Sequence, residues 1–303
     1  MQLSKMINEE LLQYLCCSKC KSDLVEKDNF LVCRRSGKKY KIKEEIPILI
    51  DLENLSINLQ KQIKYFNREA ERRKEYKLEE WQKSYIKRVE KNFILREGNI
   101  LIDVGTGSGY IAVEMAKKGL KVIACDLTLR SLITLKDVIK GEHLENKLFL
   151  ICCSAEDLPV KGQIADYLVV NAVLEHLPNE NKAIEEMNRV CKENAKLMVT
   201  VPLKYRYLNP LFIPVNYIHD KRIGHLRRYD CDDLKTKFRE VGFKITRVFY
   251  TGHFLKTMGV IFSMLFNIHY CDEKFEELDN KKVNKRYRAN NICVCLQRRR
   301  DGS

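Results

Sequence analysis

The feature that most constrains the fold is a series of short apolar segments that alternate with longer amphipathic segments from residue 99 onward. The short segments suit buried strands, and the longer ones suit helices that cross between strands. Strands joined by helical crossovers build a parallel sheet with helices on both faces. We therefore predict a doubly wound α/β fold with strands near residues 100–104, 121–125, 148–153, 167–170, 197–201, 243–250 and 292–297.

A glycine-rich turn follows the first strand, in Asp103-Val-Gly105-Thr-Gly107-Ser-Gly109. Such a turn lets backbone amides approach a ligand closely. In a dinucleotide fingerprint the third glycine lies one residue later, and no Gly-Lys-Ser/Thr of a nucleoside-triphosphate loop follows here. Asp103 disfavours a pyrophosphate, and Asp126, at the end of the next strand, is placed to accept hydrogen bonds from ribose hydroxyls. A nucleoside with a positive centre and no phosphate fits both carboxylates.

These residues resemble the class I S-adenosylmethionine-dependent methyltransferases, of the type-11-like kind, from about Asn99 to Gln297. Ser154 to Pro159, after the third strand, and Ala165 to Pro178, around the fourth, carry the same resemblance. It implies a Rossmann-like seven-stranded sheet and S-adenosyl-L-methionine as cofactor. Ser154 stands where many relatives have Asp. The cofactor contacts that it implies are Asp103, Gly105, Thr106, Gly107, Gly109, Asp126, Leu127, Ser154, Ala155, Glu156 and Asn171.

Residues 1–52 form a small cysteine-containing unit before this domain. Leu11 to Asp51 resembles the zinc-ribbon-like activator that pairs with tRNA, rRNA and release-factor methyltransferases, which implies that Cys17, Cys20 and Cys33 bind zinc. A structural zinc site takes four ligands, and the fourth position falls on Ser36, a poor ligand. A metal-free module, with the cysteines as small core residues, is therefore the alternative. With or without metal, the apolar segment 46–50 could dock on the catalytic domain.

Changes in composition divide the chain into three parts. Residues 1–52 are the small module, residues 53–98 are a charged, mostly helical connector, and residues 99–303 are the methyltransferase domain. Two insertions interrupt that domain, at 203–229 and 252–291. The second carries an apolar stripe at helical spacing from Phe254 to Phe266, which is either core or a helix for an anionic membrane or a lipid tail.

Candidate residues that bind or activate the methyl acceptor lie after the fourth strand and in the first insertion. His176 could act as a base, or it could only orient its loop. In the ubiquinone-type O-methyltransferases a similar Glu-His pair, with a further Glu three residues before it, binds a divalent ion, and here that position is Ala172. In the insertion, the adjacent Arg227 and Arg228 could bind an anionic group on the acceptor, or one of them could instead satisfy the carbonyls at a helix end. The substrate-binding candidates are His225, Arg227, Arg228 and Tyr229.

Charge and cysteine content bear on partners and location. The net charge of +14 favours RNA or a translation factor as acceptor, whereas the insertions and the apolar stripe favour a small molecule or a lipid-linked intermediate. An Asn-Pro-Pro-Tyr-like signature, typical of amino-group methylation, is missing after the fourth strand, so we favour the second class. A cofactor-binding protein without catalysis is a third alternative. Twelve cysteines without a secretory signal indicate the cytoplasm, with a position peripheral to the membrane as the alternative, and we expect no transmembrane helix.

Overall fold

The computed structural model describes residues 7–50, 55, 57–72, 76–259 and 273–299. It contains a seven-stranded sheet in the order β10-β11-β9-β8-β5-β6-β7. Its parallel strands are β5 (Ile100–Val104), β6 (Lys121–Asp126), β7 (Leu148–Cys152), β8 (Ala165–Asn171) and β9 (Cys191–Pro202). Strand β11 (Asn291–Arg298) runs antiparallel to β9 and to β10 (Phe243–Thr251). The α/β fold with a Rossmann-like seven-stranded sheet is therefore confirmed.

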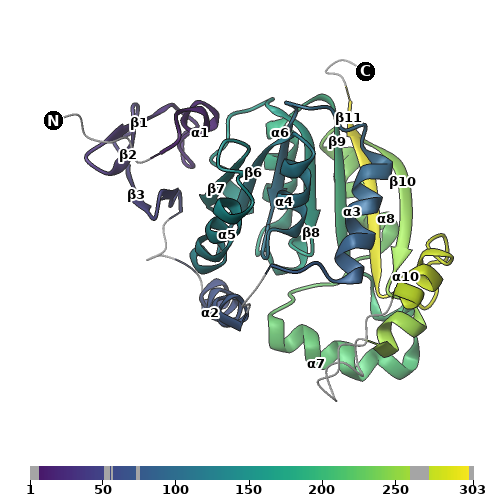
Figure 1. The fold of residues 1–303 in the computed structure, drawn as a ribbon. Coiled ribbons are helices and arrows are strands. Elements are labelled where there is room, and N and C mark those ends of the chain that lie inside the picture. Colours follow the sequence, from purple (N-terminus) through teal and green to yellow (C-terminus); the bar gives the residue numbers. More distant parts are fainter. Residues whose placement is uncertain (1–6, 51–54, 56, 73–75, 260–272, 300–303) are drawn as a thin grey trace.

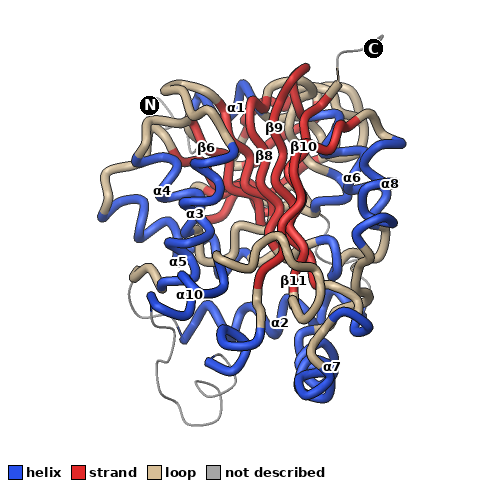
Figure 2. Tube along the Cα trace, turned by 90° about the vertical axis from the view of Figure 1, so that its right-hand side faces the viewer, coloured by secondary structure: helices blue, strands red, loops and turns tan. Residues whose placement is uncertain are grey.

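Helices cover both faces of this sheet, as its view along the edge shows (Figure 2). On one face pack α3 (Glu80–Asn92), α4 (Tyr110–Lys117) and α5 (Leu129–Gly141), whose buried side chains share one apolar core with the sheet. On the other face, α6 (Glu180–Val190) and α8 (Cys231–Glu240) share a second core with it. Each strand of the parallel part is apolar on both sides because both faces are covered.

The amino-terminal module has a sheet of its own. After α1 (Glu9–Tyr14) the chain forms four antiparallel strands, β1 (Leu24–Lys27), β2 (Phe30–Cys33), β3 (Lys39–Lys43) and β4 (Ile46–Pro47). The module lies beside β7, at the purple end of the chain in Figure 1. Its apolar side chains join the same core as α6 and α8, so the module completes that layer next to β7.

Backbone contacts attach the module to the edge of the large sheet. Ile48 forms a parallel bridge with Cys152 of β7, and the Leu49 amide donates to the Cys152 carbonyl at 2.8 Å. Leu15 forms an antiparallel bridge with Val160. The module thus covers an edge strand that would otherwise expose unpaired amides and carbonyls, and the apolar segment 46–50 docks as the sequence predicted.

Two further helices cross the carboxyl ends of the strands, below the sheet in Figure 1. These are α2 (Ile57–Arg72), from the predicted connector, and α7 (Ile213–Ile223), from the first insertion. In the second insertion the structure describes a helical segment at 254–259 and α10 (Glu273–Asn280). Most of the predicted apolar stripe, including Ile261 and Phe262, lies outside the described residues. Among the described helices, none is long and apolar enough to span a bilayer.

Candidate active site

A cavity of about 320 Å³ lies where the parallel strands β5, β6, β7 and β8 end. This is the place where open α/β sheets bind their ligands, and the volume is in the range of small-molecule sites. The glycine turn and the segments that follow β6 and β7 form one part of its lining. Apolar side chains form much of the rest, namely Leu59, Ile63, Phe66, Trp81, Val173 and Leu177.

The glycine turn is held in a conformation that leaves no room for a side chain. The amides of Gly105 and Thr106 both donate to the Cys125 carbonyl, at 2.8 and 3.0 Å, which ties the turn to β6. Gly105 has a φ of +69°, in the left-handed region that glycine tolerates best. A Cβ at this position would lie 2.3 Å from Cγ2 of Val173. The turn therefore packs directly against the loop that follows β8.

Replacing Gly105 by alanine should weaken cofactor binding by about 1 to 3 kcal/mol, because the added methyl group overlaps Val173 and displaces one of the two loops that line the cavity. Calorimetry with S-adenosylmethionine measures the loss. Gly37→Ala is the matched control, since Gly37 has a φ of +67° and nothing within 4 Å of the added Cβ. Equal affinities for the two variants would contradict the prediction.

Asp126 stands at the end of β6 and faces the cavity. Its Oδ2 accepts a hydrogen bond from the Gly107 amide at 2.8 Å, and its Oδ1 accepts one from the Thr128 amide at 2.7 Å. A carboxylate has about four lone-pair sites, so it can accept from several donors at once. The two amides hold the side chain in place at the cavity. Leu127, next in the chain, also lines the cavity.

Asp103 and Gly109 take supporting positions instead of the contacts that the sequence predicted, because neither belongs to the cavity lining. Asp103 is 1% exposed, and its Oδ2 accepts from Thr106 Oγ1 at 2.7 Å, which fixes the turn from behind. Burial raises the pKa of its carboxyl to about 7, although the Thr106 hydrogen bond opposes the shift. Gly109 precedes α4, and a Cβ there would lie 2.3 Å from Leu135 of α5.

The segment after β7 lines the cavity with Ser154, Ala155 and Glu156. The Ser154 hydroxyl accepts from the Glu156 amide at 3.1 Å and so caps a short 3-10 helix, η1 (Ala155–Asp157). Glu156 in turn accepts from the Asn179 amide at 2.6 Å, which ties η1 to the start of α6. Ser154 therefore has a local structural role in addition to any contact with a base.

The loop after β8 brings Asn171 and His176 to the cavity. Asn171 Nδ2 donates to the Tyr110 hydroxyl at 2.8 Å. His176 lies in the 3-10 helix η2 (Leu174–His176), is 8% exposed, and packs its ring against Phe66. Burial, and next the neighbouring His225, lower the pKa of His176 to about 3. The imidazole is therefore neutral near pH 7, where it is a weak base but can bind a metal ion.

The four predicted substrate-binding residues do not line the cavity and have internal partners. Arg228 pairs with Asp220 at 2.5 Å and donates to the Leu203 carbonyl at 3.0 Å. Arg227 donates to the Leu177 carbonyl at 2.6 Å, and its second nitrogen lies 3.3 Å from the Pro178 carbonyl, so it satisfies the end of η2. The Tyr229 hydroxyl donates to Glu180, and His225 lies 2.8 Å from Asp220. These side chains hold the insertion against the η2 loop.

The sequence did not assign the predicted connector to the site. Helix α2 supplies Leu59, Gln62, Ile63 and Phe66 to the lining, and Trp81 comes from α3. Gln62 is 5% exposed, and its Nε2 donates to the carbonyls of His176 and Gly224, both at 3.1 Å. The helical spacing of Leu59, Ile63 and Phe66 in an otherwise strongly charged segment was the available signal.

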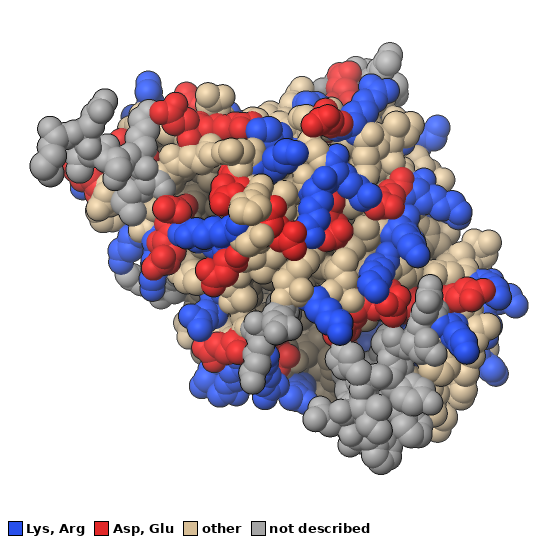
Figure 3. Space-filling model, in the orientation of Figure 1, with Lys and Arg blue, Asp and Glu red and all other residues tan. Residues whose placement is uncertain are grey.

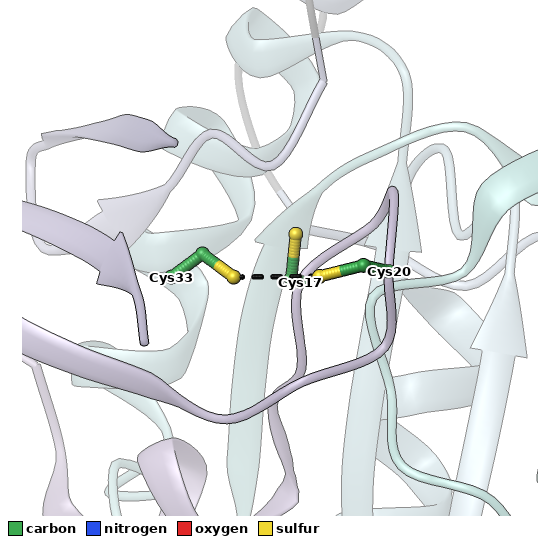
Figure 4. Close-up of side chains that lie close together, drawn as sticks. All are labelled: Cys17, Cys20 and Cys33. Atoms are coloured by element: carbon green, nitrogen blue, oxygen red, sulfur yellow. Dashed lines mark hydrogen bonds between the residues drawn. The ribbon is translucent and has the colours of Figure 1, made fainter. Parts of the chain in front are cut away.

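The three cysteines predicted to bind metal come together in the amino-terminal module (Figure 4). Their Sγ atoms lie within 4.8 Å of one another, with 3.4 Å between Cys20 and Cys33. Burial raises the pKa of Cys33, but hydrogen bonds from Ser36 outweigh it and lower the pKa to about 6. Cys17 also has a lowered pKa, because the hydrogen bonds from Tyr40, Lys19 and Cys20 together outweigh the opposing effect of burial. The cluster therefore presents donors suited to a thiophilic metal, and the Ser36 amide donates to Cys33 Sγ at 3.3 Å.

Comparison with known proteins agrees with this geometry. Residues 71–248 match the family described as "Methyltransferase domain", and that match covers more than half of the chain. The chain belongs to this methyltransferase family. Among solved structures, the geranyl diphosphate C-methyltransferase of Streptomyces coelicolor shares the fold, with a TM-score of 0.61 and 11% identity over 81% of this chain and 99% of that one.

Two curated relatives match about a third of the chain. The ubiquinone/menaquinone biosynthesis C-methyltransferase of Rickettsia prowazekii is 30% identical over 115 residues, which are 35% of this chain and 46% of the relative. The tRNA 5-carboxymethoxyuridine methyltransferase of Escherichia coli is 26% identical over 98 residues, 32% of this chain and 38% of the relative. The chain thus matches less than half the length of these relatives.

Proposed function

We propose that this protein transfers a methyl group from S-adenosylmethionine to an acceptor bound in the same cavity. The single observation that carries the proposal is the Asp126 carboxylate, held by two backbone amides at the polar end of the cavity beside the glycine turn. Displacement at a sulfonium methyl needs little more than an aligned nucleophile, because the leaving group is already activated. A cavity that binds the cofactor and the acceptor side by side would supply that alignment.

Replacing Asp126 by alanine should weaken S-adenosylmethionine binding by about 1 to 3 kcal/mol, because charged hydrogen bonds to the ribose are lost. Isothermal calorimetry measures the change. Asp137→Ala is the control, since Asp137 is exposed on α5 and should have no effect. Full affinity in the Asp126 variant, or none in the unaltered protein, would remove the basis for this assignment.

For the acceptor, we infer a small or lipid-linked molecule with a substantial apolar part. Phe66, Trp81, Leu177 and other apolar side chains form much of the cavity lining, and α2 contributes several of them. On the face that Figure 3 shows, basic and acidic side chains are interspersed, which does not favour an RNA surface there. The net charge of +14 still supports RNA as the alternative.

Tritium transfer from labelled S-adenosylmethionine into a fractionated cell extract tests the acceptor class. Label that partitions into organic solvent or into the small-molecule fraction supports the proposal. Label confined to RNA would establish the alternative, and label in no fraction would point to cofactor binding without catalysis. Phe66→Ala should reduce transfer while leaving the melting temperature nearly unchanged, since Phe66 is only partly buried.

We also propose that residues 1–52 are a docking module that binds zinc through Cys17, Cys20 and Cys33. The mutual distances of the thiols and the lowered pKa of Cys33 support it, and thiolates are the ligands that zinc prefers. Replacing Cys33 by serine should remove one equivalent of zinc from the purified protein, as measured by elemental analysis. Cys231→Ser is the control, since Cys231 lies in α8, away from the cluster. Identical zinc contents would show that the module is metal-free.

A further inference from the structure

Three side chains that can bind a metal meet at the wall of the cavity. Glu175 and His176 come from η2, and His225 comes from the end of the first insertion, after α7. One ligand atom from each lies within 4.8 Å of the others, and His225 Nε2 is 3.7 Å from Glu175 Oε1. The sequence suggested an incomplete site, because Ala172 stands three residues before the Glu-His pair. The fold supplies a third donor from a segment about fifty residues further along the chain.

Two of these metal-binding side chains each have a buried atom without a hydrogen-bond partner. Within the described part of the chain, Glu175 Oε2 and His176 Nδ1 have no hydrogen-bond partner. Glu175 is 1% exposed and His176 is 8% exposed, so water does not readily replace the missing partner. Burying a polar atom without a hydrogen bond costs roughly 1 to 3 kcal/mol. Two such atoms on neighbouring residues of one donor cluster indicate that something outside the polypeptide satisfies them.

The third donor is held by a second carboxylate. His225 Nδ1 lies 2.8 Å from Asp220 Oδ1, which leaves Nε2 directed to the side of Glu175. Asp220 is fixed in turn by Arg228, at 2.5 and 2.9 Å, and by the Tyr205 hydroxyl at 2.5 Å. Histidines that bind metals commonly donate their other ring nitrogen to a carboxylate, which fixes the ring and raises its basicity. The Asp220 network has that arrangement.

We propose that Glu175, His176 and His225 bind a divalent transition-metal ion. Two imidazoles and one carboxylate suit zinc, cobalt or ferrous iron better than magnesium or calcium, which prefer oxygen ligands. His176 is then a metal ligand through Nδ1 and not a base. Three protein ligands leave coordination positions free, and His176 lines the cavity. Taken with the proposed function, this points to an acceptor that carries an oxygen donor, although binding of the ion does not depend on methyl transfer.

Cobalt titration of the full-length protein tests the site, followed by visible absorption. A Cys17→Ser, Cys20→Ser and Cys33→Ser background removes the thiol cluster, so that a cobalt spectrum without thiolate charge transfer reports the second site. His225→Ala should weaken cobalt binding by at least about tenfold. Replacing even a residue that only hydrogen-bonds to a metal ligand typically lowers metal affinity 10 to 100-fold. His225→Asn keeps a hydrogen-bond donor for Asp220 but has no imidazole. It should show the same loss of cobalt affinity, and it replaces the alanine variant if that variant folds poorly.

His219→Ala is the matched control, because its ring centroid lies 6.3 Å from that of His225 but it is not part of the donor cluster. Its cobalt affinity should be unchanged. No cobalt spectrum in the cysteine-free background with a native melting temperature would overturn the inference, as would equal losses in the His219 and His225 variants. Calorimetry with S-adenosylmethionine on the same samples keeps the two proposals apart, since a failed metal site leaves cofactor binding intact.

Discussion

Replacing Leu15 by alanine should lower the free energy of unfolding by about 2 to 5 kcal/mol, the usual cost of removing a leucine side chain from a packed core. Leu15 is fully buried, and its backbone bridges Val160 of the large domain. Its side chain belongs to the core cluster that α6, α8 and one face of the sheet share. A change in the small module should therefore destabilise the whole protein.

Urea unfolding, followed by circular dichroism and by cofactor binding, measures the effect. Leu211→Ala is the control, because Leu211 is 67% exposed and its truncation should cost little. Deleting residues 1–52 should have a larger effect in the same direction, since it uncovers the edge of β7 and part of that core. An unchanged unfolding curve for both the Leu15 variant and the deletion would mean that the module is an independent appendage.

Replacing Asp103 by asparagine should remove a pH dependence of stability in the cofactor-free protein. Burial raises the pKa of this carboxyl from its ordinary 3.8 to about 7. Between these values the folded chain keeps a proton that the unfolded chain has released, so stability falls as the pH rises through this window. One unit of difference between two pKa values corresponds to about 1.4 kcal/mol, so the window carries up to roughly 4 kcal/mol.

Chemical unfolding at pH 5 and at pH 8 makes the comparison. The unaltered protein should lose stability between the two values relative to Asp103→Asn, whose amide does not titrate and can still accept from Thr106. Asp137→Asn, at an exposed position, should follow the unaltered protein. Parallel pH profiles for all three proteins would show that Asp103 is ionised throughout.

Local patterns were enough to predict the seven strands and the glycine turn, because strand periodicity and left-handed glycines are properties of short segments. Gly105 and Asp126 reach the cavity as predicted from their places at strand ends. Asp103 was predicted as a contact, but spacing does not reveal whether a side chain at a strand end points to the ligand or behind the loop. The sequence did not reveal the partners of Arg227 and Arg228 either, because these partners are carbonyls and a carboxylate that the fold brings from other segments.

The sequence by itself determined the class of fold, the methyltransferase family and the polar end of the cavity, since these depend on neighbours in the chain. Only the tertiary structure decided what closes the cavity and which side chains meet there. Helix α2 becomes a wall through Gln62, and His225 joins Glu175 and His176 from a distant insertion. Such contacts depend on how separate helices and loops pack over the strand ends, and no periodicity within a segment records that packing.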